Sequence, residues 1–441
     1  MSSENKSFEL SEDKLEVIKA IKESDNNVFI TGKAGSGKTV LLKYLSENLN
    51  ENVAVVAPTG VASLNAGGVT IHSMFQLPFA PYKPMFIRGV SMSRLPKYNL
   101  REDKINMLRA LDTLIIDEIS MVRADLMDAI NDALCFYREN KEPFGGVRLI
   151  MIGDLFQLPP VVIPREWAMV SGYYSTPYFF GSKALSIDGF DTYNLTTIFR
   201  QSDDELIGLL NKIRYGNVDD EVLSKLNTMY RPDVVNDNDW IMLTATNREA
   251  ERVNQKRLKS LEGKIHTFNA TISGDFNPDD SIAVKKLELK EGAQVMILVN
   301  NSEQGYVNGT IGKFVRVIDG MDSPVLEIES DGNRYFVEEH KWSKNNYVLD
   351  ENTESIKTIE VGSMKQLPVK LAWGITIHKS QGLTFDKVAV DISRSFSHGQ
   401  AYVALSRGRT MEGIALIKKA RKHNIKCDGE LLEQIHQMIN K

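Results

Sequence analysis

The eight residues from Gly32 to Thr39 have types and spacing that suit phosphate chemistry. They read Gly-Lys-Ala-Gly-Ser-Gly-Lys-Thr and match G-x-x-x-x-G-K-[ST] at every fixed position. Glycines let such a loop turn tightly and bring backbone N–H groups close to phosphate oxygens. The Lys38 ammonium suits the β and γ phosphates of a nucleoside triphosphate, and the Thr39 hydroxyl suits Mg²⁺. We therefore expect the nucleotide to be held by Gly32, Gly35, Ser36, Gly37, Lys38 and Thr39.

Two adjacent carboxylates, Asp117 and Glu118, follow the apolar run Leu114-Ile115-Ile116. In enzymes with a phosphate loop, an Asp at the end of a neighbouring strand holds the Mg²⁺ shell. A second carboxylate beside it can activate the water that attacks the γ-phosphate. An apolar run ending in Asp-Glu is weak evidence alone. Together with the phosphate loop it predicts Asp117 at the metal and Glu118 as the general base.

A third polar group, Gln157, lies in the run Gly153–Val161, which contains two prolines. This run follows an apolar stretch at 147–152, so Gln157 is expected at another strand end. Its amide suits a hydrogen bond to the γ-phosphate or to the attacking water. A simple turn stiffened by the prolines explains the run equally well.

A phosphate loop needs a strand before it and a helix after it. Val28-Phe29-Ile30 predicts a short buried strand, and the apolar positions from Val40 to Leu49 predict a helix. Other runs rich in Val, Ile and Leu without strict alternation are typical of parallel strands covered on both faces. They lie at 52–57, 113–116, 147–152 and 192–195. Helical patterns separate them, so the sequence predicts a doubly wound α/β domain.

A second α/β unit is expected from near Asp191, with strands at 240–244, 387–392 and 414–417. It is interrupted at about 291–342 by short β-rich runs between Gly, Asp and Asn turns, which predict a small inserted β-barrel. These runs are 294–299, 310–318, 324–329 and 334–338. In the first unit, the proline-rich and aromatic stretch 76–99 predicts an irregular insertion. It is either a contact surface for a partner or a plain surface loop.

The composition indicates a globular protein without a membrane segment. The chain has 441 residues, of which 42% are hydrophobic and 25% charged, and its net charge is −5. No apolar run approaches the roughly 20 residues that span a bilayer, and the first ten residues do not resemble a signal peptide. Only Cys135 and Cys427 are present, so neither a disulfide framework nor a zinc pattern is expected. We expect a cytoplasmic, nucleoid-associated protein whose basic residues gather locally, as they do between Arg394 and Lys426.

The ordered motifs of the chain resemble those of superfamily-one helicases. The run from Phe144 to Pro160 is similar to the Pif-one branch in particular, whose relatives include RecD. The resemblance spans about Asn27 to Leu416 and rests on these segments: Gly32–Thr39, Ala57–Ala62, Thr70–Phe75, Asp117-Glu118, Gly153–Pro160, Leu195–Gln201, Trp373–Gly382 and Ala401–Arg409.

The resemblance implies an ATP-dependent DNA helicase that moves 5′→3′ on single-stranded DNA. Two RecA-like domains would clamp ATP and Mg²⁺ between them, with Lys38, Glu118 and Gln157 on the first. Arg200 and Arg407 would reach the γ-phosphate from the second domain as arginine fingers. Gly382 would lie at the nucleotide as part of the motif that ends there.

The resemblance also implies a DNA track across both domains. Hydroxyls, backbone N–H groups and a Lys suit phosphates, and an aromatic ring such as that of Phe75 suits base stacking. The first-domain contacts would be Pro58, Thr59, Gly60, His72 and Phe75. The second-domain contacts would be Thr244, Asn247, His378 and Lys379.

The family organisation implies a first RecA-like domain at 1–190 with a small wedge-type insertion at about 76–105. The second RecA-like domain would comprise 191–265 and 366–441, and an SH3-like β-barrel would occupy 266–365. One departure concerns the base: the family places a Gln near the N-terminus, whereas the corresponding stretch here carries Lys14. A Gln reads the adenine edge with both a donor and an acceptor, whereas Lys has donors only, so adenine selectivity by this contact is in doubt.

The expected partners are single-stranded DNA and duplex, forked or G-quadruplex DNA, bound by a monomer and without a membrane. A second hypothesis is an ATP-driven, nucleic-acid-stimulated switch or remodelling ATPase that separates no strands. A third, a non-catalytic nucleic-acid-binding module, conflicts with the intact Lys38, Asp117 and Glu118.

Overall fold

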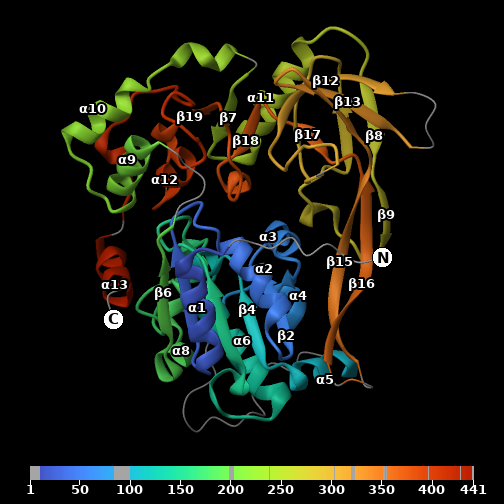
Figure 1. The fold of residues 1–441 in the computed structure, drawn as a ribbon. Helices are drawn as coiled ribbons and strands as arrows, with labels where there is room; N and C mark the ends of the chain where they lie inside the picture. The colour runs from blue at the N-terminus through green and yellow to red at the C-terminus, as the bar shows by residue number, and fades with distance from the viewer. Residues whose placement is uncertain are drawn as a thin grey trace.

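A six-stranded parallel sheet forms the centre of the first domain (Figure 1). The computed structural model describes residues 10–83, 100–197, 203–237, 239–301, 303–318, 323–350, 353, 355–395, 397–427 and 429–439. The strands of this sheet are β1 (Val28–Gly32), β2 (Val53–Ala57), β3 (Val69–Thr70), β4 (Thr113–Ile116), β5 (Arg148–Ile152) and β6 (Asp191–Leu195). Their order is β3-β2-β4-β5-β1-β6, and every adjacent pair is parallel.

Helices cover both faces of this sheet, as the doubly wound pattern predicts. Val28 and Ile30 of β1 share a core with α1 and α2, whereas Phe29 faces the core that contains α5 and α6. The helices of this domain are α1 (Glu12–Glu23), α2 (Lys38–Asn48), α3 (Gly60–Ala66), α4 (Ile71–Phe75), α5 (Glu102–Ala110), α6 (Ala124–Arg138), α7 (Pro164–Trp167) and α8 (Lys183–Asp188).

The structure bears on the expected end of the first domain at residue 190 and on the expected insertion at about 76–105. β6 pairs with β1 along Asp191–Leu195, so the first sheet extends past the boundary that the sequence places at residue 190. Most of the expected wedge-type insertion, residues 84–99, lies outside the described residues. Within the expected 76–105 range, α5 begins at Glu102.

A second parallel sheet forms the second domain, which confirms the predicted α/β class with two parallel sheets. Its order is β18-β7-β19-β20, and all its pairs are parallel. The strands are β7 (Ile241–Thr244), β18 (Gly374–Thr376), β19 (Val388–Val390) and β20 (Ile414–Leu416). The helices are α9 (Asp204–Arg214), α10 (Asp220–Thr228), α11 (Asn247–Ser260) and α12 (Gln400–Leu405).

The C-terminal helix α13 (Gly429–Ile439) returns to the first domain. It contacts β6, and its Leu431 and Ile435 belong to the same core cluster as Phe29. Short 3₁₀ helices complete the chain at Ile119–Met121, Pro143–Gly146, Phe179–Gly181, Pro232–Asn236, Pro278–Asp280, His378–Ser380, Ile392–Arg394 and Lys422–Asn424.

The β-rich insert contains a five-stranded antiparallel sheet of order β14-β13-β12-β11-β17. These strands are β11 (Gln294–Ile297), β12 (Ile311–Ile318), β13 (Val325–Ser330), β14 (Asn333–Val337) and β17 (Val369–Leu371). Four of them fall on the short runs that the sequence indicates. A pair formed by β8 (His266–Asn269) and β10 (Lys286–Leu289) shares their core. The assignment of this insert as an SH3-like barrel stays a prediction.

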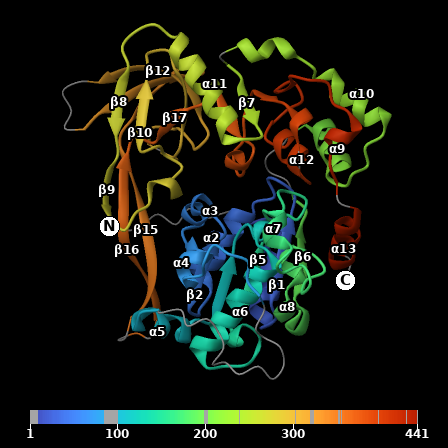
Figure 2. The same cartoon turned by 180° about the vertical axis from the view of Figure 1, so that it is seen from behind.

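A long hairpin connects the insert to the first domain (Figure 2). It consists of β15 (His340–Asp350) and β16 (Ser355–Gln366), and β9 (Thr271–Gly274) pairs with β16. The Tyr347 hydroxyl accepts a hydrogen bond from the backbone N–H of Val55, at 3.0 Å. The backbone N–H of Ile356 donates to Asn52 Oδ1 at 2.9 Å. The hairpin therefore contacts both β2 and the residue that precedes it, Asn52.

Candidate functional site

The phosphate loop lies between β1 and α2, as the sequence predicts. Gly35 and Gly37 have φ of 82° and 80°, a backbone region in which a side chain is strained. Lys38 Nζ donates to the carbonyls of Gly32 and Lys33 at 2.7 and 3.1 Å, so its ammonium lies over the loop. The buried Ser36 hydroxyl has no hydrogen-bond partner among the described residues. Thr39 is exposed in the first turn of α2.

Asp117 and Glu118 follow β4, which is two strands away from β1 in the sheet. Asp117 Oδ1 accepts from the Glu118 N–H at 2.9 Å, and Glu118 has a left-handed backbone with φ of 49°. Burial raises the pKa of both carboxyls above their ordinary values, and Asp117 raises that of Glu118 further. The Lys38 charge opposes both shifts, which indicates that the loop and the carboxylates act on one another.

Asp154 and Gln157 follow β5 and are buried. The Gln157 amide donates to Asp154 Oδ2 at 3.1 Å. Burial alone would raise the pKa of Asp154, but the charges of Arg214 and Lys38 hold it below its ordinary value. The amide nitrogen that the sequence assigns to a phosphate or a water is therefore bonded to Asp154 in this structure.

Arg214 is the partner of Asp154, and no sequence motif points to it. It ends α9 in the second domain, and its Nη2 lies 2.8 Å from Asp154 Oδ1. Both side chains are only 1% exposed. The guanidinium also lies over the Phe156 ring, 4.1 Å from its centroid. Burial opposes the charged form of Arg214, yet Asp154 holds its pKa above the ordinary value. Basic residues in the last turn of a helix are common, so no sequence signal marks this one as buried.

The second domain also contacts the phosphate loop directly. Tyr402 Oη of α12 accepts a hydrogen bond from the Ala34 N–H at 3.3 Å. Gly399 lies so close to the first domain that a Cβ there would come within 2.1 Å of the Gln157 carbonyl oxygen. The loop and the ends of β4 and β5 thus line an interface that the second domain completes.

Arg407 follows α12 and is almost fully buried. Its guanidinium donates to the carbonyls of Ser380 and Leu383 and to Ser406 Oγ, at 3.3, 3.2 and 2.8 Å. Its positive charge nevertheless favours the ionised form of Glu118 and so opposes part of the rise in the pKa of that carboxyl. The role of Arg407 as a finger stays a prediction, and Arg200 lies outside the described residues. Gly382, with φ of 79°, follows the 3₁₀ helix that begins at His378.

The expected first-domain DNA contacts cluster around α3 and α4. Pro58, Thr59 and Gly60 follow β2, and the exposed Thr59 caps α3 by accepting from the Ala62 N–H. His72 is half-buried, and burial lowers its pKa. The ring of Phe79 stacks on His72 with centroids 4.3 Å apart.

The assignment of Phe75 to base stacking is wrong for this structure. Phe75 is 0% exposed because Ile71, Met74 and Phe75 form the apolar face of α4 and pack in the first core. Phe79, four residues later, is 89% exposed, so its ring is accessible to a base.

The expected second-domain DNA contacts lie near the ends of β7 and β18. Thr244 is buried, and its hydroxyl donates to the carbonyls of Thr246 and Ile375. His378 is half-buried with its pKa lowered by burial. Asn247 and Lys379 are exposed and line one groove of about 440 Å³ between α11 and the insert. Its other cationic lining residues are Arg248, Lys286 and Lys370.

Lys370 strengthens the positive character of this groove. Burial, and then the charge of Lys379, lower the pKa of Lys370 to about 8. A bound anion would relieve the repulsion between the two ammonium groups. Glu251 and Glu288 also line this groove, so its lining carries charges of both signs.

Lys14 lies in α1 and is 2% exposed. Its Nζ donates to Ser11 Oγ at 2.7 Å, and burial lowers its pKa. The neighbouring Asp13 accepts from the backbone N–H groups of Thr196 and Thr197, at 2.9 and 3.0 Å, which ties α1 to the chain after β6. Lys14 is thus engaged within the protein, in keeping with its lack of an acceptor for adenine.

The described part of the chain contains neither a cluster of potential metal ligands nor a helix suited to a bilayer. No group of three or more His, Cys, Asp or Glu side chains there is arranged to hold a metal ion. None of the described helices has the length and apolar character needed to cross a bilayer.

Comparisons with known proteins agree with this geometry. The family model described as PIF1-like helicase matches residues 9–222. The human "ATP-dependent DNA helicase PIF1" is 33% identical over 96% of this chain, and the chain spans 63% of the length of that protein. Pif1 from Bacteroides sp. in complex with ADP-AlF4 is 40% identical, with a TM-score of 0.89, and the match covers 98% of this chain and 97% of that one.

A second crystal structure, Bacteroides Pif1 bound to ssDNA, has the same coverage and 40% identity but a TM-score of 0.68. The backbone of this chain therefore superposes less closely on the ssDNA complex than on the ADP-AlF4 complex, at the same sequence identity. The order of the motifs and the fold both point to this family, and so does the similarity over 97% of a solved relative. The chain belongs to the PIF1-like helicase family.

Proposed function

We propose that this chain is an ATP-dependent DNA helicase that moves 5′→3′ on single-stranded DNA and unwinds duplex or structured DNA. The observation that carries the proposal is the interface between the two parallel-sheet domains. There, Tyr402 and Arg214 of the second domain meet Ala34 and Asp154 of the first. Because the second domain touches both the phosphate loop and a strand end beside it, a change at the nucleotide can move one domain against the other.

The described residues fit ATP and Mg²⁺. The Ser36 hydroxyl is buried without a partner, Gly35 and Gly37 open the loop backbone, and Lys38 lies over it. We propose that Gly32, Gly35, Ser36, Gly37 and Lys38 hold the phosphates, with Gly382 nearby. Thr39 and Asp117 would hold Mg²⁺, which, when bound, neutralises charge on the phosphates.

The chain's own groups then have distinct roles. Glu118, ionised, would accept a proton from the attacking water, and Lys38 would stabilise charge on the phosphate oxygens. Gln157 would orient that water or the γ-phosphate once its amide leaves Asp154. Arg407 and Arg200 would supply positive charge from the second domain.

The proposed DNA track runs across both domains. The exposed side chains of Thr59 and Phe79 belong to the first domain, and Asn247 and Lys379 to the second. Pro58, Gly60, His72, Thr244 and His378 are proposed to shape the track around them. One solved relative is described as bound to ssDNA, and another structure is described as the basis for DNA unwinding at forked dsDNA by Pif1 helicases, which supports the same two partners here. A monomer, nucleoid localisation and G-quadruplex binding stay parts of the proposal.

An unwinding assay tests this function. The protein with ATP and Mg²⁺ should separate a duplex that carries a 5′ single-stranded tail and leave a 3′-tailed duplex of the same sequence intact. Lys38→Ala should separate neither. ATP hydrolysis stimulated by single-stranded DNA without separation of either duplex would instead favour the remodelling ATPase.

A further inference from the structure

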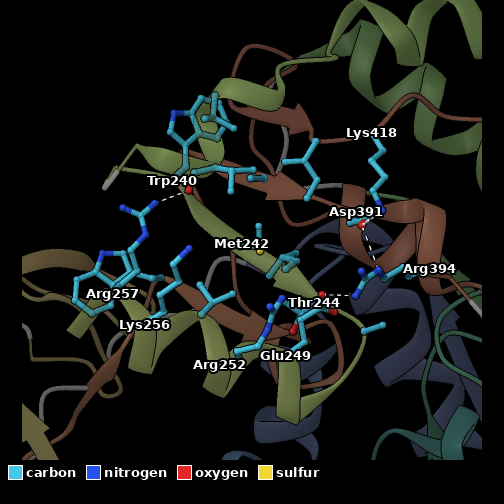
Figure 3. Close-up of a pocket in the computed structure, with 18 of the residues that line it drawn as sticks. Trp240, Met242, Thr244, Glu249, Arg252, Lys256, Arg257, Asp391, Arg394 and Lys418 are labelled. Carbon is cyan, nitrogen blue, oxygen red and sulfur yellow. Dashed lines mark hydrogen bonds and ion pairs between the residues drawn. The ribbon is translucent and has the colours of Figure 1, made fainter. Parts of the chain in front are cut away.

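A groove separate from the nucleotide interface lies on the outer face of the second domain (Figure 3). It encloses about 440 Å³ between α11 and the strands β7, β19 and β20. Pockets that take small ligands or anchoring side chains have volumes of about 300–1,000 Å³. Thr244, which is proposed to shape the DNA track, lies at one end of the groove, and the proposed nucleotide site uses none of its lining residues.

Apolar side chains make up much of the groove lining. They are Ala389 of β19, Met242 of β7, Ile417, Val234 and Trp240. Parallel sheets are normally covered on both faces, and here α11 covers only the β18 and β7 side. Trp373 also lines the groove, and its indole N–H has no acceptor among the described residues.

The rim of the groove carries its charge unevenly. At the end near Thr244, Arg394 pairs with Glu249 and lies 3.6 Å from Asp391, and Lys418 lies 3.0 Å from Asp391 (Figure 3). Two cations and two carboxylates balance there. Farther along α11, Arg252 and Lys256 are exposed and form no ion pair in the described part of the chain.

We propose that this groove binds an acidic peptide segment of a partner protein, with an apolar side chain on its floor and carboxylates on Arg252 and Lys256. Charge complementarity supports the choice, because the unbalanced positive charge lies beside the apolar floor. The Trp373 N–H would meet a peptide carbonyl. The proposal goes beyond helicase activity and does not depend on it.

The same observations disfavour a nucleic acid as the occupant. Single-stranded DNA binds through exposed aromatic faces and a positive track for its phosphates. Trp240 is only 8% exposed and is covered by Arg231, whose Cζ lies 4.8 Å from the ring centroid. The end of the groove nearest Thr244, where a DNA strand would enter, carries the carboxylates Glu249 and Asp391.

Fluorescence anisotropy of a labelled peptide tests the proposal on the full chain. The probe is fluorescein-Gly-Asp-Glu-Asp-Asp-Ile-Leu-Phe. Control peptides replace either its acidic residues by amides or its three apolar residues by Ser. We expect saturable binding of the probe only, and a loss of about tenfold or more in affinity for the double variant Arg252→Glu/Lys256→Glu. Lys259→Glu, on the same helix but outside the groove, should bind the probe as the unaltered chain does.

Three results would overturn the proposal. The first is no saturable binding of the probe up to about 1 mM, the weak limit for a specific contact. The second is equal binding by the double variant. The third is a double variant that loses affinity for a single-stranded oligonucleotide to the same degree, which would assign the groove to DNA.

Discussion

Asp154 and Arg214 form an ion pair of 2.8 Å that joins the end of β5 in the first domain to the end of α9 in the second. Both side chains are 1% exposed, so neither charge has water to replace its partner. Removing one member of such a pair leaves a buried charge unpaired and typically costs about 3–5 kcal/mol of stability.

Arg214→Ala should therefore lower both stability and DNA-stimulated ATP hydrolysis. Lys212→Ala, on the same helix in an exposed ion pair with Glu221, should change stability by no more than about 1 kcal/mol. Denaturant unfolding of the two variants measures the difference. The double variant Arg214→Met/Asp154→Asn should recover stability but not DNA stimulation if the pair couples the domains. Recovery of both would reduce the pair to a structural contact.

Lys38→Ala and Glu118→Gln should each abolish ATP turnover for different reasons. The first removes the charge over the phosphate loop, and the second removes a carboxylate that can accept a proton. Glu118→Gln should keep its affinity for ATP and for single-stranded DNA, as measured by equilibrium binding. Normal hydrolysis by Glu118→Gln would exclude it as the base.

The rate of ATP hydrolysis should fall on acidification at a higher pH than an ordinary carboxylate would impose. Glu118 acts as a base only when ionised, and burial together with Asp117 raises its pKa. A raised pKa means that protonation, and hence loss of activity, begins at higher pH as the pH is lowered. Steady-state rates between about pH 5 and 8 test this, with circular dichroism at each pH to exclude unfolding. A rate that is constant down to pH ~5 would contradict the assignment.

Truncation of Phe79 should weaken DNA binding without loss of stability, whereas truncation of Phe75 should destabilise the fold. Phe79→Ala removes a ring that is 89% exposed, so affinity for single-stranded DNA should fall by the ~1–3 kcal/mol of one base stack while stability is kept. Phe75→Ala empties a core position and should cost about 3–5 kcal/mol of stability. Oligonucleotide titrations and thermal unfolding distinguish the two. Unchanged DNA affinity in Phe79→Ala would remove that ring from the track.

The sequence predicted those features of the fold that are determined by residues close to one another along the chain. The phosphate loop is a local pattern, and Val28-Phe29-Ile30 and Leu114-Ile115-Ile116 form buried strands because continuous apolar runs suit a sheet covered on both faces. The spacing of Ile71, Met74 and Phe75 was also a usable signal, since it places three apolar residues on one face of a helix.

Contacts between distant segments could not be predicted in this way. Arg214 lies in an ordinary helix end, and only the folded chain brings it to a carboxylate sixty residues earlier. Tyr347 lies within a hairpin strand, yet its hydroxyl reaches the backbone of Val55, nearly three hundred residues away. Such pairings follow from the arrangement of whole domains.

The chain enters the second domain after β6 and returns to β6 through α13, so both covalent connections lie at one edge of the first sheet. The hairpin carrying Tyr347 contacts β2, on the far side of β4, β5 and β1. Two fixed attachments at one edge define a hinge axis, and a hydrogen-bonded contact near the opposite edge can be broken and remade. We expect the domains to open by rotation about the β6 edge, which requires the hairpin either to bend or to withdraw Tyr347, Leu349 and Ile356 from the first core.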